Sequence, residues 1–280
     1  MGFSSLNKTV ALLVLLLATF TTLSLGHGNR GGGGGTQVGF YSSTCPRVES
    51  IVRSAVESAV QANPTIAPGL LRMFFHDCFI NGCDASILID GPTTEKSAGP
   101  NSLLRGFEVI DAAKSQLETT CPGVVSCADI VALAARDSVV LTGGRGHTIG
   151  TAACSLFSYR LYNFNNTNGP DPDINPAFLP LLRALCPNGG DGSRRVALDT
   201  SSENSFGSSF YENLRNGRGV IESDAKLWSD QRTQRYVQGF LGQSGSRFNA
   251  EFGRAMVNMG NIEVKTGRQG EIRRVCTATN

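Results

Sequence analysis

Hydrophobic residues in the first half of the chain recur every three or four positions, a spacing typical of amphipathic helices. Pro64 and Pro68 interrupt this pattern early, and Gly143 ends it. Ser126 stands immediately before an apolar run, where it serves as a helix cap. Four helices are therefore predicted, over 48–60, from residue 70 onward, over 107–117 and over 127–141.

Shorter helical patterns follow in the second half of the chain. They are predicted over 156–161, where Leu156, Phe157 and Leu161 would share one face, and over 175–185, 210–214, from 223 on, 233–241 and 247–259. The last pattern predicts a buried stripe formed by Phe248, Phe252, Ala255, Met256 and Met259. No long alternating strand, internal repeat or heptad array is evident, so the predicted fold class is mostly α.

The first 35 residues differ in composition from the rest. Lys8 is followed by an apolar run from Val10 to Phe20 and then by small and polar residues, which predicts a signal peptide over 1–26. The alternative is a signal anchor, although the run is short for a membrane span. Residues 27–35 are rich in glycine and predict a disordered tether, so the folded domain is expected over 36–280.

Composition excludes some classes of partner. The 25 Lys and Arg residues nearly balance the 23 Asp and Glu residues, which argues against nucleic-acid binding. A length of 280 residues allows one large domain or two lobes, and no segment after the leader is apolar enough to span a membrane. Asn165 opens an Asn-Asn-Thr sequence, a glycosylation acceptor in secreted proteins.

The chain carries eight cysteines, all of them beyond the predicted leader. An even number in a secreted chain predicts four disulfides, and the sequence alone leaves 105 pairings open. A zinc site is disfavoured, because no Cys-x-x-Cys motif occurs and the chain has only three histidines.

The stretch 70–86 carries the chemistry. Arg72 and His76 are four residues apart and share one face of an apolar helix with Phe75. A cation and an imidazole are costly in such a place unless they serve a function, although a single histidine there is more often part of a core. The following loop offers oxygen atoms at the density that calcium prefers, from Asp77, Ile80, Gly82, Asp84 and Ser86. Its individual pieces can also be interpreted as a local disulfide and a turn.

The string Arg-x-x-Phe-His-Asp-Cys-Phe-x-x-Gly-Cys-Asp-Ala-Ser, which begins at Arg72, resembles the distal haem signature of the secreted plant (class III) haem peroxidases. The resemblance covers nearly all of the chain after the leader. It implies two helical lobes that enclose haem b. It also implies the disulfides Cys45–Cys121, Cys78–Cys83, Cys127–Cys276 and Cys154–Cys186.

The resemblance assigns roles on the distal side of the haem. His76 would accept a proton from hydrogen peroxide and pass it on, with Asn101 fixing the tautomer of its ring. Arg72 would stabilise charge on the departing oxygen, and Phe75 would wall the haem face. Glu95 would connect this network to a distal calcium ion held by the loop residues named above.

On the proximal side, His147 in Gly-His-Thr-Ile-Gly would be the axial iron ligand, and Asp224 would accept a hydrogen bond from its second nitrogen. As an alternative, Asp224 is an ordinary carboxylate near a helix start. A second calcium site would involve Thr148, Asp199 and Ser202. Gly207 stands where the family places a carboxylate, so weak or no calcium binding is expected there.

The chain departs from the family between Gly144 and His147. Only Arg145 and Gly146 stand there, whereas the family has two helices and their loops, roughly 40–50 residues at ordinary element lengths. The deletion would remove one wall of the haem pocket and the arginine partner of Asp129, unless Arg145 replaces it. An omitted exon or a splice variant would explain the abrupt seam.

Three hypotheses follow. The first is an extracellular peroxidase of the cell wall or apoplast, monomeric, which oxidises small phenolic donors with hydrogen peroxide in peroxide catabolism and the response to oxidative stress. The second is a secreted, disulfide-bonded, calcium-binding remnant without efficient catalysis. The third is a calcium-dependent wall-binding module, supported only by Asp77, Asp84 and Ser86.

Overall fold

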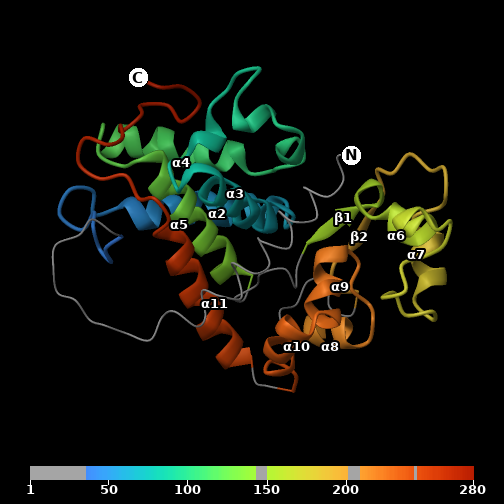
Figure 1. Ribbon diagram of the computed structural model, residues 1–280. Helices are drawn as coiled ribbons and strands as arrows, with labels where there is room; N and C mark the ends of the chain where they lie inside the picture. Colours follow the sequence, from blue (N-terminus) through green and yellow to red (C-terminus); the bar gives the residue numbers. More distant parts are fainter. Residues whose placement is uncertain (1–35, 143–149, 201–208, 243–244) are drawn as a thin grey trace. The chain divides into compact units, whose positions relative to one another are not determined.

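The computed structural model describes residues 36–142, 150–200, 209–242 and 245–280, which form two compact, mostly helical units (Figure 1). Unit 1 contains the described residues from 150 to 245, and unit 2 contains 36–142 and 246–280. The predicted leader and tether lie outside the described residues, as do His147, Thr148, Ser202 and Gly207. No helix in the described residues is both long and apolar enough to span a membrane.

Unit 2 is a bundle in which α2, α3 and α4 each pack against α5. Its helices are α2 (Val48–Ala62), α3 (Ile66–Asn81), α4 (Phe107–Thr120), α5 (Cys127–Leu141) and α11 (Gly245–Gly260), with the short 3₁₀ helices η1 (Ser86–Leu88), η2 (Glu95–Ser97) and η3 (Gly99–Asn101). The periodic residues of the sequence form its core, as in α2, where Val48, Ile51, Val52 and Val56 are buried. The oxygen Oγ of Ser126 accepts a hydrogen bond from the backbone N–H of Asp129 and caps α5 as predicted.

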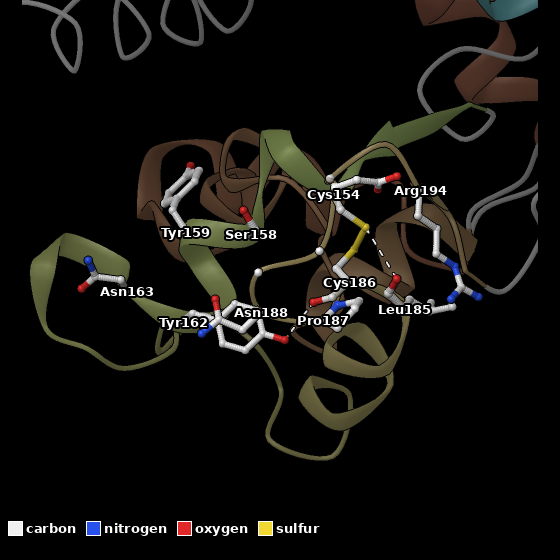
Figure 2. A pocket seen from close by; sticks show the side chains of 14 residues that line it. Cys154, Ser158, Tyr159, Tyr162, Asn163, Leu185, Cys186, Pro187, Asn188 and Arg194 are labelled. Atoms are coloured by element: carbon white, nitrogen blue, oxygen red, sulfur yellow. Dashed lines mark hydrogen bonds between the residues drawn. A yellow bond between two sulfur atoms is a disulfide. The ribbon is translucent and has the colours of Figure 1, made fainter.

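Unit 1 combines a two-stranded antiparallel sheet with short helices. Strands β1 (Thr151–Ala153) and β2 (Arg195–Ala197) pair with Ala152 opposite Val196. The helices are η4 (Cys154–Leu156), α6 (Ser158–Tyr162), η5 (Phe164–Asn166), α7 (Leu179–Leu185), α8 (Ser209–Arg215), α9 (Glu222–Ser229) and α10 (Gln231–Gln238). The Cys154–Cys186 disulfide joins the start of η4 to the end of α7 (Figure 2).

A buried ion pair organises the loops of unit 1. The side chains of Arg160 and Asp171 are both fully buried, and Arg160 Nε lies 2.8 Å from Asp171 Oδ2. Arg160 also donates to the carbonyl oxygens of Gly219 and Val220. One side chain on α6 thereby fixes two loops, the one at Asp171 and the one at Gly219 and Val220. Each bond satisfies a polar group whose burial would otherwise cost free energy.

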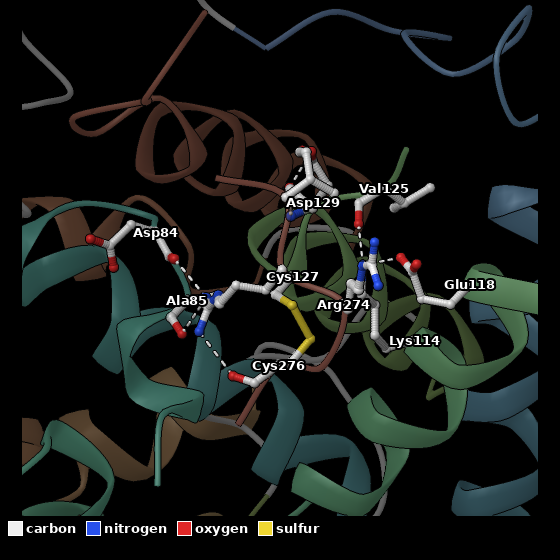
Figure 3. The surroundings of a disulfide bond; sticks show 12 residues. Asp84, Ala85, Lys114, Glu118, Val125, Cys127, Asp129, Arg274 and Cys276 are labelled. Carbon is white, nitrogen blue, oxygen red and sulfur yellow. Dashed lines mark hydrogen bonds and ion pairs between the residues drawn. A yellow bond between two sulfur atoms is a disulfide. The ribbon is translucent and has the colours of Figure 1, made fainter. Parts of the chain in front are cut away.

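The C-terminal segment closes unit 2. Cys276 forms a disulfide with Cys127 at the start of α5, and Figure 3 shows this bond near Lys114, which donates to the carbonyl oxygen of Val125. The other two disulfides of the unit are Cys45–Cys121 and Cys78–Cys83. The four bonds in the structure are the four pairs that the family resemblance implies.

Two expectations about local structure are wrong. Residues 151–157 begin with a strand and a 3₁₀ helix, and α6 starts only at Ser158, so Leu156 is exposed while Phe157 and Leu161 are buried. In α11, Met259 is buried, but Phe248 and Phe252 are only half-buried and Ala255 is exposed. The helical period of α11 was predicted correctly. The prediction that the whole stripe is buried was wrong, because only its C-terminal end packs into the core of unit 2.

The buried pair generates a stability prediction. Asp171→Asn should lower the free energy of unfolding by about 3–5 kcal/mol, because it leaves the charge of Arg160 buried without its counter-ion. Urea denaturation would measure the loss. The matched control is Glu251→Gln, which breaks the exposed pair with Arg254 and should cost no more than about 1 kcal/mol. Equal losses in both variants would contradict the assignment.

Candidate functional site

The distal candidates lie on α3, as the sequence predicts. Met73 and Phe74 anchor one side of the helix in the core, and Arg72, Phe75 and His76 remain partly accessible on the other. The ring centroids of Phe75 and Phe79 are 4.5 Å apart, and that of Phe75 is 6.0 Å from the His76 ring. The helix thus presents an imidazole and a cation beside an aromatic wall.

Hydrogen bonds define the state of His76. Its Nδ1 lies 2.5 Å from Asn101 Oδ1, and Asn101 Nδ2 donates to the Glu95 carbonyl oxygen at 2.7 Å. Because that second bond turns Oδ1 toward the imidazole, His76 must donate from Nδ1–H. Arg72 Nε donates to His76 Nε2 at 3.1 Å, which requires a lone pair on Nε2. The geometry therefore specifies a neutral ring with its proton on Nδ1.

The electrostatics agree with a neutral ring. Burial lowers the pKa of His76 below its ordinary value of 6.5, and the nearby charge of Arg72 lowers it further, although the hydrogen bond to Asn101 opposes both. Arg72 also donates to the Pro100 carbonyl oxygen at 2.9 Å. His76 can consequently accept a proton at Nε2, and Arg72 is held close enough to stabilise negative charge formed there.

The predicted oxygen-rich loop folds against the end of α3. The Asp77 carboxylate is buried and accepts a hydrogen bond from the Ala85 N–H at 2.9 Å. Asp84 Oδ1 accepts from the Ser86 N–H at 3.0 Å. Ser86 Oγ and Glu95 Oε2 are buried without a hydrogen-bond partner among the described residues, and Asn81 donates to the other oxygen of Glu95.

Carboxylates gather around this loop at an electrostatic cost. Burial raises the pKa of Asp77 to about 7, and the charges of Asp84 and Glu95 add to that effect, while two backbone N–H groups oppose it. Burial also acts to raise the pKa of Asp84, but hydrogen bonds from Lys265 and Ser86 outweigh it and leave the pKa below its ordinary value. A bound cation would relieve the repulsion that Asp77 experiences.

The donor set fits a hard cation such as calcium. The described residues contain no group of three or more His, Cys, Asp or Glu side chains placed to hold a metal. The expected ligands, however, include only two carboxylates, from Asp77 and Asp84, together with one hydroxyl and two backbone carbonyls. The buried, unpartnered oxygens of Ser86 and Glu95 are the structural observation in favour of a cation, because such atoms are rare in folded proteins.

The C-terminal segment holds this loop in place, which sequence reasoning missed. Lys265 pairs with Asp84, and Arg273 donates to the carbonyl oxygens of Asp84 and Ala85. Gly82 has φ +91°, and a Cβ there would collide with Glu263. Nearly two hundred positions separate Lys265 and Arg273 from the loop that they contact. No sequence pattern links residues so far apart, so these contacts could not be predicted from the sequence.

The proximal candidates are only partly within the described residues. Asp224 is buried on α9, and its charge contributes, after burial, to the raised pKa of Tyr211. Asp199 is fully buried and accepts hydrogen bonds from Ser209 and Asn213, each at 2.7 Å. The predicted partners His147, Thr148 and Ser202 lie outside the described residues, so their proximity to these carboxylates remains a prediction.

Asp129 is not left unpaired by the short seam. Its Oδ2 accepts hydrogen bonds from Tyr41 at 2.5 Å and from Ser126 at 2.6 Å, and the side chain is half-buried. Arg145, the other partner considered from the sequence, lies outside the described residues. The expected cost of a fully buried, unpartnered carboxylate is therefore absent, because two hydroxyl groups satisfy it.

The hydrogen bond to Asn101 gives a pH prediction. Asn101→Asp should raise the pKa of His76 by about one to three pH units, because a carboxylate stabilises the imidazolium. The wild-type ring should titrate below 6.5 and the variant above the wild-type value, as measured by NMR of the three histidines. Asn168→Asp, on an exposed loop of unit 1, is the control. An unchanged titration in Asn101→Asp would show that the two side chains are not in contact.

Comparison with known proteins places these residues in a family. The peroxidase family profile matches residues 52–145 and 145–243. Peroxidase N1 of Nicotiana tabacum is 51% identical, over 99% of this chain and 98% of its own length. Peroxidase 71 of Arabidopsis thaliana is 48% identical over 88% of this chain and 90% of its own, and Peroxidase 70 is 45% identical over 100% and 99%.

The same comparisons locate a difference in length. The alignment with the tobacco protein extends over 331 positions, more than the 280 residues of this chain, so the relative has stretches without a counterpart here. The two matched pieces of the family profile meet at residue 145. With a mostly helical fold, four disulfides and this degree of identity, the chain belongs to the plant class III peroxidase family and is a peroxidase.

Proposed function

We propose that the protein is an extracellular haem peroxidase that reduces hydrogen peroxide and oxidises small phenolic donors by one-electron steps. The observation that carries the proposal is the neutral His76, held by Asn101 on one nitrogen and by Arg72 on the other. An isolated core histidine needs neither a fixed tautomer nor a neighbouring guanidinium. Family membership supplies the reaction type, and this geometry supplies groups suited to it.

The described residues fit haem b on the distal side. His76, Arg72 and Phe75 share the accessible face of α3. His147 would be the axial ligand, and Asp224 would accept a hydrogen bond from its second nitrogen. When bound, haem supplies the redox chemistry that no side chain in this set can perform. Phe75 and Phe79 offer an apolar surface that would exclude water and bulky donors from that face.

The chain's own residues perform the proton transfers. Nε2 of His76 accepts a proton from hydrogen peroxide and returns it to the oxygen that leaves as water. Asn101 keeps Nδ1 protonated throughout, so Nε2 presents its lone pair before it takes the proton and again after it has returned it. Arg72 stabilises the negative charge that grows on the leaving oxygen.

Calcium completes the proposal. The distal ion would be held by Asp77, Asp84 and Ser86 and by the carbonyls of Ile80 and Gly82, with Glu95 next to it. It would fix the loop that carries Glu95, and Glu95 orients Asn101 through its carbonyl. At the second site, Asp199 is already satisfied by Ser209 and Asn213, which agrees with weak binding there.

The proposed location is outside the cell, in the wall or apoplast. The signal-peptide pattern over 1–26, four disulfides and the acceptor Asn165 support secretion. We propose a monomer without nucleic-acid or membrane partners, which acts in peroxide catabolism and the response to oxidative stress.

A second candidate function is a peroxidase with impaired catalysis. The junction of the matched pieces at residue 145 and the longer alignment support an internal deletion before His147. Such a form would keep the calcium loop and disulfides while binding haem poorly.

His76→Ala distinguishes these candidates. It should retain haem uptake, seen in the Soret band, but slow the reaction with peroxide by about 10²- to 10⁴-fold, because it removes the proton acceptor. Stopped-flow spectroscopy and guaiacol turnover would measure the loss. Wild-type protein that takes up no haem would favour the impaired form, and unaltered turnover in His76→Ala would refute the assigned role.

Removal of calcium should destabilise the protein. At calcium concentrations of about 100 times Kd, the melting temperature should exceed that in excess EGTA by about 5–10 °C, because the ion binds only the folded loop. Asp84→Asn should abolish most of this difference, whereas Asp191→Asn, at an exposed site in unit 1, should preserve it. Identical melting curves with and without calcium would exclude the site.

A further inference from the structure

A tyrosine on α6 is coupled to a carboxylate in a way that the proposed haem chemistry does not use. The hydroxyl of Tyr159 donates to Glu222 Oε2 at 2.6 Å. The side chain of Tyr159 is 44% exposed, although most of an exposed phenol's hydrogen bonds go to water. Its ring lies nearly parallel to that of Phe164, with centroids 6.3 Å apart and an angle of 18° between the planes.

The same tyrosine lines a pocket of about 400 Å³ between α6 and the loop after α7. Figure 2 shows Tyr159 and Tyr162 from α6 among the lining side chains, with Asn188 and Arg194 contributed by the loop. The Cys154–Cys186 disulfide is part of the lining and fixes its shape. This volume accommodates an aromatic ring, and the mixed polar and apolar lining suits a phenol with its substituents.

The Tyr159–Glu222 pair has the chemistry of a proton-coupled electron donor. Burial raises the pKa of the Tyr159 hydroxyl, and the hydrogen bond and charge of Glu222 raise it further, so the phenol stays protonated at ordinary pH. A phenol that loses an electron must then lose its proton as well. The Glu222 carboxylate is already at hydrogen-bond distance to receive it.

We propose that Tyr159 is a second oxidation site, at which phenolic donors too bulky to reach the haem are oxidised. The proposal rests on the proposed haem peroxidase function, which supplies the oxidant: the haem oxidised by hydrogen peroxide. Glu222 and Asp224, the proposed partner of the axial ligand, lie on the same helix α9, so the pair belongs to the unit that carries the proximal carboxylate.

The electrons and protons balance. Tyr159 would give one electron to the bound haem after its oxidation by hydrogen peroxide. The phenolic proton would pass to Glu222, which leaves a neutral tyrosyl radical and a protonated carboxyl group. A phenolic donor in the pocket then returns one electron to Tyr159, and Glu222 returns the proton. The donor, now a radical cation, releases its own proton to water and leaves as a phenoxyl radical.

Tyr162 is an internal control in the same pocket. Its hydroxyl donates to the carbonyl oxygen of Cys186 at 2.8 Å, and a carbonyl is too weak a base to take the proton. The guanidinium carbon of Arg183 lies 5.2 Å from the centre of the Tyr162 ring, and this positive charge opposes loss of an electron. Both tyrosines therefore line the pocket, but of the two it is Tyr159 whose hydroxyl has a carboxylate to accept its proton.

The first experiment compares two donors in the haem-loaded enzyme, free guaiacol and guaiacyl groups grafted by short linkers onto a large dextran. Tyr159→Phe and Glu222→Gln should each slow oxidation of the dextran donor by about tenfold or more, a barrier increase of about 1.4 kcal/mol. Guaiacol turnover should change by less than about twofold. Tyr162→Phe should affect neither donor. Normal oxidation of the dextran donor by Tyr159→Phe would overturn the proposal.

The second experiment does not depend on peroxidase activity. The full chain without added haem is oxidised by a photogenerated ruthenium(III) complex in the presence of a spin trap, and the adducts are located by peptide mass spectrometry. The trap should mark Tyr159, and Glu222→Gln should remove the mark. Adducts confined to Tyr162, Tyr211 or Trp228 would overturn the proposal. Absence of guaiacol turnover together with trapping at Tyr159 would count against the haem peroxidase function and leave the redox pair supported.

Discussion

The buried carboxylate of Asp77 is the constraint on which the distal side depends. Asp77 belongs to the C-terminal part of α3, and its carboxylate accepts hydrogen bonds from the loop N–H groups of Ala85, at 2.9 Å, and Ile87, at 3.5 Å. That loop leads to the segment that contains Glu95, whose carbonyl oxygen orients Asn101. Asn101 in turn fixes the proton on Nδ1 of His76, the residue before Asp77. The buried carboxyl group of Asp77 therefore connects the oxygen-rich loop to the imidazole of His76 through backbone hydrogen bonds. A cation bound at the loop would for this reason affect the geometry of His76.

Local patterns allowed the helices of unit 2 to be predicted, and the distal signature allowed its site residues to be named. Ser126 correctly predicted the start of α5, and the four-residue spacing of Arg72 and His76 correctly predicted that they share one face of α3. Partners distant in sequence were not predictable. Nothing around Lys265 indicates Asp84, and nothing around Tyr41 indicates Asp129, because side-chain pairing follows the fold and not the period of a helix. The predicted burial of the apolar stripe on α11 was wrong for a related reason. Periodicity indicates which residues share a face of a helix, but it does not indicate what packs against that face.

The two units solve the problem of buried polarity differently. In unit 1, Arg160 spreads its hydrogen bonds over Asp171 and two backbone carbonyls, so the buried guanidinium has both a counter-ion and a loop backbone as partners. Unit 2 has an extensive apolar core and buries Arg273 and Asp77 as well, but these two side chains bind backbone groups of the oxygen-rich loop instead of each other. Tyr159 and Glu222 belong to neither arrangement, because their bond lies at the surface and fixes no buried loop. This difference is the reason to assign the pair a chemical role.

The bond between Cys127 and Cys276 has a consequence for biosynthesis. The two cysteines are 149 positions apart, and the whole of unit 1 is encoded between them. While the ribosome translates that stretch, Cys127 has no correct partner, although Cys45, Cys78, Cys83 and Cys121 have already emerged. The nascent chain must therefore avoid or reverse wrong pairings until its final few residues are made, so maturation should depend on disulfide isomerase more than the other three bonds would suggest.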